Sequence, residues 1–225
     1  MADARIEADL KGDLYEQFAR VGKALGSGKR LELLDLIAQG ERTVDALARA
    51  AGLGLTTASA HLQTLKRAGV VTTRREGTRV YYRLAGDDVA ALYVLLRGVA
   101  QRHLAETERA RAAYLGAGTE AVGRDELLAR AEEGSVVVLD VRSHEEYAAG
   151  HIPGALSVPL AELDERLAAL PPDREVVAYC RGGYCVLAYD AVRLLRSHGR
   201  RARRLADGML EWRVAGLPVA VGAAD

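Results

Sequence analysis

Cysteine, aromatic residues and long apolar runs are scarce in this chain of 225 residues. Its two cysteines, Cys180 and Cys185, exclude a disulfide framework, and aromatic residues make up only 5% of the sequence. No segment approaches the roughly 20 apolar residues of a membrane span, and the mixed-charge residues 1–9 lack the apolar core of a signal peptide. We therefore expect a cytoplasmic protein without membrane contact, in a reducing compartment where paired cysteines are more often reactive than structural.

Net charge is also absent, because 31 basic residues balance 31 acidic ones. The balance is a cancellation, since residues 1–118 carry a net charge of +4 and residues 119–225 carry −4. The most basic part is residues 42–83, with eight arginines and lysines against two acidic residues. Such an asymmetry indicates nucleic-acid contact by one part of the chain. The length and the hydrophobic share of 49% predict one large or two small folded domains.

The first half of the sequence predicts helices followed by a hairpin. Apolar residues recur every three or four positions through most of residues 10–112. Two stretches alternate instead, residues 70–73 and 79–83, and Glu76-Gly77 joins them as a hairpin turn. A long helix is expected after Asp87 and Asp88, with one apolar stripe formed by Val89, Leu92, Leu96, Val99 and His103.

Helices followed by a basic hairpin make the winged form of the helix-turn-helix. Residues 10–112 resemble the ArsR-type bacterial repressors, through the segments TVDALARAAGL (43–53), ASAHLQTLKRAGVV (58–71) and REGTRVYYRL (75–84). The resemblance implies a DNA-binding transcriptional regulator whose partner is a double-stranded operator. It also implies a homodimer formed through residues 12–25 and 88–110, and the apolar stripe from Val89 to Val99 supports the second part of that interface independently.

The helix expected at about residues 55–68 has its polar side chains at the N-terminal end. Four of them are expected to reach base edges in a major groove, namely Thr56, Thr57, Ser59 and His61. Five basic residues suit the phosphate backbone or the minor groove: Lys66 and Arg67 on the helix, and Arg74, Arg75 and Arg79 at the hairpin. The alternative is that Thr and Ser cap the helix, His61 packs on it and the arginines form a solvated face.

Many members of this family sense metals through cysteines in the third helix or His and carboxylate ligands in the last one. Residues 1–179 contain no cysteine, and His103 with Glu106 is the only ligand-like pair at helical spacing. Two ligands do not make a zinc site. We therefore predict no metal site and no cofactor, and expect the sensing function elsewhere in the chain.

Beyond residue 119, apolar β-branched runs alternate with helical patterns. The segment 114–119, with two glycines, breaks the periodicity and divides the chain into residues 1–115 and residues 119–225. Continuous apolar strands between helices are typical of a mainly parallel α/β sheet covered on both faces. The expected strands are 135–140, 155–158, 175–180 and 201–205, and the expected helices are 145–149, 160–170 and 186–197.

Four motifs in this half resemble a single rhodanese domain, which is thiosulfate sulfurtransferase-like. They are VVVLDVR (136–142), EEYAAGHIPGA (145–155), YCRGGYCV (179–186) and DGMLEW (207–212) followed by AGLP (215–218). The match covers nearly all of residues 119–221. It implies an α/β domain in which a cysteine accepts sulfur from a sulfane-sulfur donor such as thiosulfate or a persulfide.

The chemistry around Cys180 can also be argued from the residues. Cys180 ends an apolar strand and precedes a loop that enters a helix, so backbone N–H groups should converge there and lower its pKa from about 8.5. Gly182 and Gly183 leave room for the loop to curl, and Arg181 adds a cation for an anionic donor. Related cysteine phosphatases need an arginine where Val186 stands, which favours sulfur transfer over phosphatase or arsenate-reductase chemistry. The alternative is a buried, inert cysteine.

Other residues of the motifs have alternative or supporting roles. Cys185, which follows Tyr184 in the loop, either attacks a persulfide on Cys180 to form a disulfide and release sulfide, or is a small buried residue. By resemblance, Asp140, Arg142 and His151 support the loops around the site. A second basic cluster is either a solvated face or a contact for DNA or an anionic substrate: Arg193, Arg196, Arg200, Arg201, Arg203 and Arg204, near His198.

Three functions follow from the two resemblances. The first is a dimeric transcriptional regulator, a repressor by resemblance, whose rhodanese-like domain carries or senses reactive sulfur on Cys180. The second is a thiosulfate or persulfide sulfurtransferase with an autoregulatory DNA-binding domain. The third is a regulator in which Cys180 is inert and the second domain only assists dimerisation.

Overall fold

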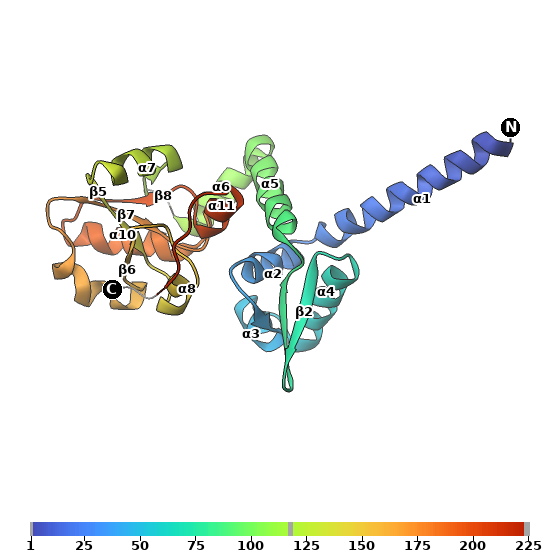
Figure 1. Cartoon of the computed structure of the whole chain (residues 1–225), viewed down its shortest axis with the longest axis horizontal. Coiled ribbons are helices and arrows are strands. Elements are labelled where there is room, and N and C mark those ends of the chain that lie inside the picture. The colour runs from blue at the N-terminus through green and yellow to red at the C-terminus, as the bar shows by residue number, and fades with distance from the viewer. Residues whose placement is uncertain (1, 117–118, 223–225) are drawn as a thin grey trace. The chain divides into compact units, whose positions relative to one another are not determined.

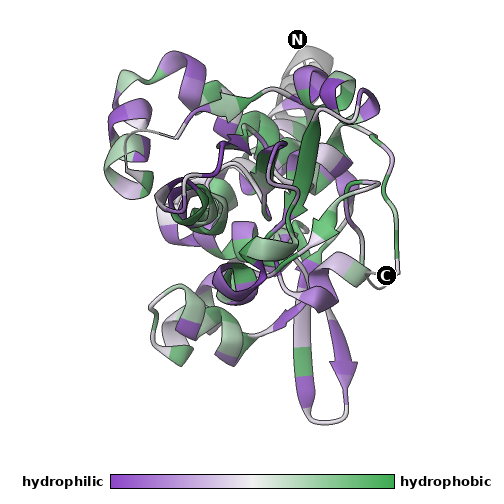
Figure 2. Cartoon of the chain, turned by 90° about the vertical axis from the view of Figure 1, so that its left-hand side faces the viewer, coloured by the Kyte–Doolittle hydropathy of each residue, from purple (hydrophilic) through white to green (hydrophobic). Residues whose placement is uncertain are grey.

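The computed structural model describes residues 2–116 and 119–222 and contains two compact units, which divide between Leu95 and Leu96. The colours of Figure 1 follow the chain from the helices and hairpin of the first unit to the parallel sheet of the second. In Figure 2 the apolar strands of that sheet contrast with the mostly hydrophilic tip of the hairpin. No helix in these two described stretches is long and apolar enough to cross a membrane.

The first unit is a small helical core with a three-stranded antiparallel sheet, in the order β1-β3-β2. Leucines at helical spacing are wholly buried in this core, including Leu33, Leu47, Leu62 and Leu65. The helices are α1 (Ala2–Leu25), α2 (Gly28–Ala38), α3 (Val44–Ala50) and α4 (Leu55–Arg67), and the strands are β1 (Arg42–Thr43), β2 (Val71–Glu76) and β3 (Arg79–Leu84).

The predicted hairpin is confirmed. Glu76 pairs with Arg79 across a two-residue turn, and Gly77 takes a φ of 57°, a left-handed conformation that favours glycine. The register places Val71 opposite Leu84, which anchors the base of the hairpin, since Val71 is buried in the core.

The long helix expected after Asp87 is confirmed as far as His103, so it carries the whole predicted stripe from Val89 to His103. α5 (Asp87–His103) ends where Leu104 adopts an extended conformation, with φ −117° and ψ 104°, and α6 (Ala105–Leu115) begins a new helix. The predicted interface segment 88–110 therefore spans two helices. Gly116, with a φ of 77°, ends α6, and residues 117–118 of the predicted junction lie outside the described residues. The compact units divide between Leu95 and Leu96, which is before the predicted domain boundary at 115–119. That boundary therefore stays a prediction.

The second unit contains a five-stranded parallel sheet in the order β4-β8-β7-β5-β6. Its strands are β4 (Ala121–Val122), β5 (Val136–Asp140), β6 (Leu156–Ser157), β7 (Glu175–Tyr179) and β8 (Ala202–Leu205). Besides α6 and the end of α5, the helices of this unit are α7 (Arg124–Glu132), α8 (His144–Ala148), α9 (Leu163–Arg166), α10 (Val186–Ser197) and α11 (Met209–Val214). Apolar clusters cover both faces, one around Leu139, Ala178 and Val192 and the other around Val138, Val177 and Trp212, as predicted.

The helix expected over residues 160–170 is broken into short pieces. A 3-10 turn (Leu160–Glu162), the single turn of α9 and a second 3-10 turn (Leu167–Ala169) replace it. Leu163 is the one residue of these three turns that is fully buried, so the segment has too little apolar face to support a continuous helix.

Candidate DNA-binding surface and cysteine loop

Helix α4 presents the side chains expected to contact DNA. Ala58, Leu62 and Leu65 hold its inner face in the core, while Thr56 and Thr57 are exposed in the first turn. The N-cap residue is Gly54, which has no side chain, so the alternative in which Thr or Ser caps this helix is wrong. Ser59 and His61 are half-buried, and Lys66 and Arg67 are exposed at the C-terminal end.

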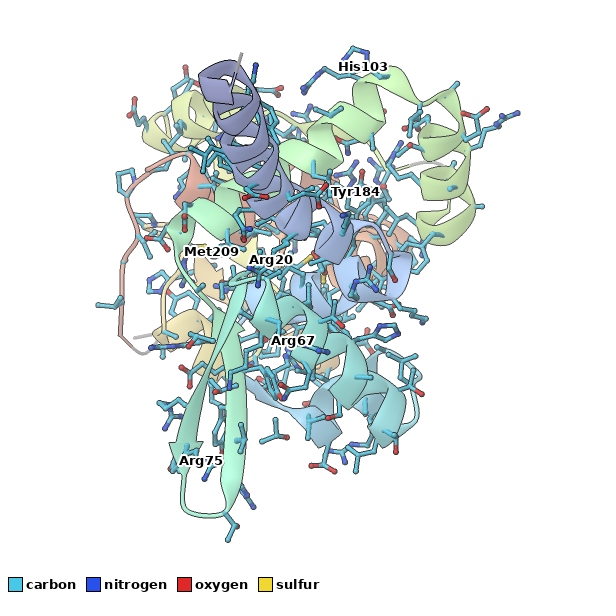
Figure 3. The ribbon with its side chains drawn as sticks, turned by 90° about the vertical axis from the view of Figure 1, so that its right-hand side faces the viewer. Arg20, Arg67, Arg75, His103, Tyr184 and Met209 are labelled. Atoms are coloured by element: carbon cyan, nitrogen blue, oxygen red, sulfur yellow. The ribbon has the colours of Figure 1, made fainter. Side chains whose placement is uncertain are left out.

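The hairpin arginines differ in their partners. Arg74 Nε lies 2.8 Å from the Glu41 carboxylate, and Arg74 Nη1 lies 2.8 Å from the Glu76 carboxylate. The hydrogen bonds to Glu76 and Glu41 raise the pKa of Arg74. The charge of Arg74, expected to contact DNA, is thus already paired with Glu76 of the hairpin and with Glu41, which precedes β1. Arg75 and Arg79 are exposed and make no ion pair in the described part of the chain. Figure 3 labels Arg75 on the hairpin and Arg67 on α4.

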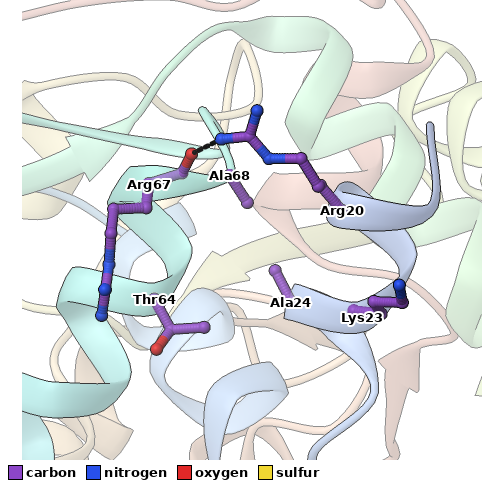
Figure 4. A pocket seen from close by; sticks show the side chains of 6 residues that line it. All are labelled: Arg20, Lys23, Ala24, Thr64, Arg67 and Ala68. Atoms are coloured by element: carbon purple, nitrogen blue, oxygen red, sulfur yellow. Dashed lines mark hydrogen bonds between the residues drawn. The ribbon is translucent and has the colours of Figure 1, made fainter. Parts of the chain in front are cut away.

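Helix α1 holds the end of α4 through a contact that the sequence did not predict. Arg20 donates a hydrogen bond to the carbonyl oxygen of Arg67 at 3.1 Å, as Figure 4 shows. A cavity of about 310 Å³ opens between the two helices and is lined by Arg20, Lys23, Ala24, Thr64, Arg67 and Ala68. On the same helix, four large apolar side chains are more than half exposed: Leu10, Leu14, Tyr15 and Phe18.

In the second unit, Cys180 and Cys185 begin and end a tight loop. Cys180 follows the last residue of β7 and is 1% exposed, while Cys185 is the N-cap of α10. The Sγ atom of Cys180 lies 3.3 Å from the carbonyl oxygen of Cys185. The first N–H groups of α11 hold the loop, because Met209 N donates to Cys180 O and Leu210 N to Arg181 O, both at 2.9 Å.

The loop needs glycine for reasons of space. A Cβ atom on Gly183 would lie 2.9 Å from Ala206 O, and one on Gly208 would lie 2.4 Å from the backbone of Gly182. The expectation that the glycines leave room for the loop to curl is thus refined: backbone fills the space beside Gly183, whereas a Cβ atom on Gly182 would lie 3.5 Å from the Glu211 carboxylate oxygens.

Comparison with known proteins matches both halves of the chain. A helix-turn-helix domain model matches residues 25–74, and a rhodanese-like domain model matches residues 123–215. An HTH-type transcriptional regulator of Mycobacterium tuberculosis is 60% identical over 217 residues, which cover 96% of this chain and 96% of that protein. The chain belongs to this family of helix-turn-helix transcriptional regulators. The regulator joins an ArsR-type winged helix-turn-helix to a rhodanese-like domain, which confirms both resemblances and the predicted fold.

Two further comparisons match one domain of the regulator each. A sulfurtransferase of Allochromatium vinosum is 37% identical over 90 residues, which cover 40% of this chain and 82% of that protein. The homodimeric winged helix-turn-helix DNA-binding domain of a possible ArsR-family regulator from Mycobacterium bovis, solved by NMR, is 60% identical. It covers 43% of this chain and 89% of that chain, with a TM-score of 0.41.

The pKa values of the regulator's two cysteines are shifted in opposite directions. Burial raises the pKa of the Cys180 thiol well above its usual range. A hydrogen bond from Cys180 lowers the pKa of Cys185 to about 6 against the opposing effect of burial, with help from the N–H groups of Leu187 and Arg181. In the reduced pair these opposite shifts favour the thiolate on Cys185 over the thiolate expected on Cys180. Backbone N–H groups of α10 reach both sulfurs, that of Ala188 at Cys180 and that of Leu187 at Cys185, so the deeper burial of Cys180 makes the difference.

Arg181 is not the free cation that the sequence suggested. Its Nε and Nη2 atoms lie 2.6 Å and 2.7 Å from the two carboxylate oxygens of Glu146 on α8. This bidentate ion pair neutralises the charge of Arg181 and connects the Cys180 loop to α8.

Asp140 and Arg142 form a buried ion pair, with Arg142 Nη2 2.6 Å from Asp140 Oδ2. The same nitrogen donates to Gly150 O at 2.8 Å, and the Tyr179 hydroxyl donates to Asp140 Oδ2 at 2.6 Å. His151 is buried and stacks on Tyr147, with ring centroids 3.6 Å apart. These contacts tie β5, β7 and the loop after α8 together, which favours the predicted supporting role.

The second basic cluster is largely occupied within the domain. Arg193 pairs with Asp190, and Arg203 pairs with Glu175 and Glu126. Arg200 donates to backbone carbonyls of the segment before β7. Arg204 differs, because it is 8% exposed and lies 4.5 Å over the ring of Tyr189, and no carboxylate of the described residues pairs with it. Because most of these arginines already bind groups of their own domain, the cluster supports the interpretation as a solvated face over a contact for DNA or an anionic substrate.

The described residues contain no group of three or more potential metal ligands close enough to hold an ion. Two groups around the cysteine loop were missed by the sequence analysis, Arg97 on α5 and Glu211 on α11, whose side chains pair at 2.9 Å. Arg97 stands alone among apolar residues of α5, and an isolated charge in an apolar stripe is the signal that could have identified it.

Proposed function

We propose that the regulator is a dimeric repressor whose Cys180 carries sulfur from thiosulfate or a persulfide, and whose affinity for operator DNA depends on that modification. The cysteine pair carries this proposal. The buried Cys180 thiol is hydrogen-bonded to Cys185, whose thiolate is favoured at the N-terminus of α10. The same chain also contains a DNA-binding domain. A paired thiol and thiolate is the arrangement that reacts with sulfane sulfur near neutral pH.

The proposed reaction uses both cysteines. The Cys185 thiolate accepts the proton of Cys180, and the Cys180 sulfur attacks the sulfane sulfur of the donor. With thiosulfate, the donor's S–S bond breaks, sulfite leaves with the bonding electrons, and a Cys180 persulfide forms. Cys185 can then attack the Cys180 sulfur, which forms a Cys180–Cys185 disulfide and releases hydrosulfide.

On the DNA-binding domain, we propose that Thr56, Thr57, Ser59 and His61 read base edges. The exposure of the first two, with no capping role, supports this assignment. Lys66, Arg67, Arg75 and Arg79 are proposed to bind phosphates. Arg74 would reach DNA only if it left Glu41 and Glu76, so its contribution is expected to be smaller.

The dimer is proposed to form through α1, because its apolar residues Leu14 and Phe18 are 52% and 60% exposed and lie one helical turn apart. Replacing Phe18 by Glu is expected to give a monomer, since a carboxylate would be buried without a partner in the interface. Light scattering after size exclusion measures the mass. Gln17→Glu adds the same charge one position away, and a dimer for both variants would contradict an interface through Phe18.

The deciding test compares DNA affinity at fixed salt for the reduced protein, the protein loaded with inorganic polysulfide, and Cys180→Ser treated identically. The probe is a duplex that the reduced protein selects from a random-sequence pool. Loading is expected to change the affinity of the natural protein by about tenfold, the usual size of a coupling of this kind, and to leave Cys180→Ser unchanged. Equal affinities for reduced and loaded protein would refute sensing and leave DNA binding intact.

Mass spectrometry of the loaded protein separates the two products. A persulfide adds about 32 Da, whereas a disulfide removes two hydrogens. A lasting adduct on Cys180 without the loss of two hydrogens would exclude the disulfide route.

A second candidate is a sulfurtransferase with an autoregulatory DNA-binding domain. The 37% identity of the rhodanese-like half to a sulfurtransferase favours it. Thiol-dependent turnover of thiosulfate that Cys180→Ala abolishes would support this activity, and modification without turnover would support sensing alone.

A further inference from the structure

The cysteine loop is contacted by the last turns of α5, which lie outside the rhodanese-like domain but within the same compact unit. Arg97 Nη1 lies 2.9 Å from Glu211 Oε1, and the guanidinium carbon of Arg97 lies 4.4 Å from the centroid of the Tyr184 ring. Gln101 donates a hydrogen bond to the Tyr184 hydroxyl. Figure 3 labels Tyr184, which is the loop residue between the glycines and Cys185.

These contacts lead to Cys180 by a short path. Glu211 Oε2 accepts the Gly208 N–H at 2.9 Å, which caps α11, and the next two N–H groups of α11 hold the carbonyls of Cys180 and Arg181. The guanidinium nitrogens of Arg97 also lie 3.8 Å and 3.6 Å from the positions that Cβ atoms would take on Gly182 and Gly183. Arg97 therefore packs directly against the loop backbone, with its side chain only 14% exposed.

We propose that Arg97 and Gln101 are positioning residues for the Cys180 loop and transmit its chemical state to α5. The inference rests on the proposed sulfur sensing and names the residues that couple it to DNA binding. Cys180 is 1% exposed, so an added sulfur atom is placed among packed protein atoms, and we infer that the loop moves to accommodate it. A moving loop carries Tyr184 with it and changes its contacts to Arg97 and Gln101.

Helix α5 is suited to pass on such a change because it is continuous from Asp87 to His103. Its first turns belong to the first unit, where Val89, Ala90 and Tyr93 are buried and the Tyr93 hydroxyl donates to Asp35 at 3.0 Å. Coupling between sites is reciprocal, so DNA that favours one position of α5 changes the equilibrium of sulfur loading by the same factor.

The test uses full-length Arg97→Gln, with Arg102→Gln as the matched control, since Arg102 is exposed on the same helix and makes no ion pair in the described part of the chain. Two quantities are measured for each: the rate of Cys180 loading by inorganic polysulfide, and the ratio of DNA affinities before and after loading. The DNA is the duplex selected by the reduced natural protein.

For Arg97→Gln we expect the loading rate to change by at least about threefold and the affinity ratio to fall toward one, while the reduced variant still binds the duplex. Arg102→Gln should match the natural protein in both. Arg97→Lys, which keeps the charge near Glu211, should recover part of the loading rate, a recovery that a purely structural defect would not give.

An unchanged rate and an unchanged affinity ratio in Arg97→Gln would overturn the positioning role. The outcome differs from failure of the sensing proposal, in which the natural protein itself has an affinity ratio of one. In that case the loading rates alone decide the inference: equal rates for Arg97→Gln and Arg102→Gln overturn it, and a threefold difference supports it.

Discussion

Replacing Cys185 by serine is expected to slow the loading of Cys180 by polysulfide at pH 7 by about tenfold or more. In the natural pair, the pKa of Cys185 is lowered to about 6, so the thiolate that accepts the Cys180 proton is mostly formed at pH 7. A serine hydroxyl does not ionise near neutral pH. Cys180 must then lose its proton alone, and burial, the largest cause of its raised pKa, remains after the substitution while the contribution of Cys185 is lost. A thiol with a pKa of about 8.5 or higher is only a few per cent ionised at pH 7.

The pH profile gives the sign of this effect. The loading rate of the natural protein is expected to rise as pH increases through about 6, where Cys185 ionises, and then to level off. In Cys185→Ser the rate should keep rising well beyond pH 8, because burial opposes ionisation of Cys180. Stopped-flow measurement between pH 5 and 9 decides the question, and a variant that keeps a midpoint near 6 would show that the lowered pKa belongs to Cys180.

Local patterns in the sequence predict several elements well. Helix α10 was expected over residues 186–197 and occupies Val186–Ser197, because its apolar face repeats every three or four positions and Cys185 and Gly199 flank it. The hairpin was predicted from alternation and from the Glu76-Gly77 turn, both of which are properties of adjacent residues. The cysteine loop was identified for the same reason, since its motif is continuous in the chain.

The charges of the site could not be assigned in this way. Arg181 finds Glu146 across 35 positions of sequence, and Arg74 finds Glu41 across 33. The sequence analysis expected Arg181 to attract an anionic donor and Arg74 to bind DNA, because the carboxylates that pair with them come close only after folding. The ionisation of the cysteines has the same origin, since it depends on how deeply each sulfur is buried and on the hydrogen bond between them, which residue spacing does not determine.

Replacing Arg142 by methionine is expected to lower the free energy of unfolding of the rhodanese-like domain by about 3 to 5 kcal/mol, the usual result of breaking a buried ion pair. Asp140 is fully buried and takes three hydrogen bonds from the Arg142 side chain. After the substitution, the Tyr179 hydroxyl and the backbone N–H of residue 142 still donate hydrogen bonds to the Asp140 carboxylate. Gly150 O also loses its donor. Urea unfolding of the full chain, followed by tryptophan fluorescence, measures the loss, because Trp212 is buried in this domain.

Arg124→Met is the matched control, since it removes an ion pair to Asp207 of similar length, 2.9 Å, whose side chains are 38% and 31% exposed. Water screens this pair, so we expect a loss below about 1 kcal/mol. Similar losses for the two variants would contradict the supporting role of Asp140 and Arg142. A large loss of unfolding free energy for Arg142→Met alone, with Cys180 still reactive below the unfolding transition, would show that Asp140 and Arg142 support the structure of the site and take no part in the reaction.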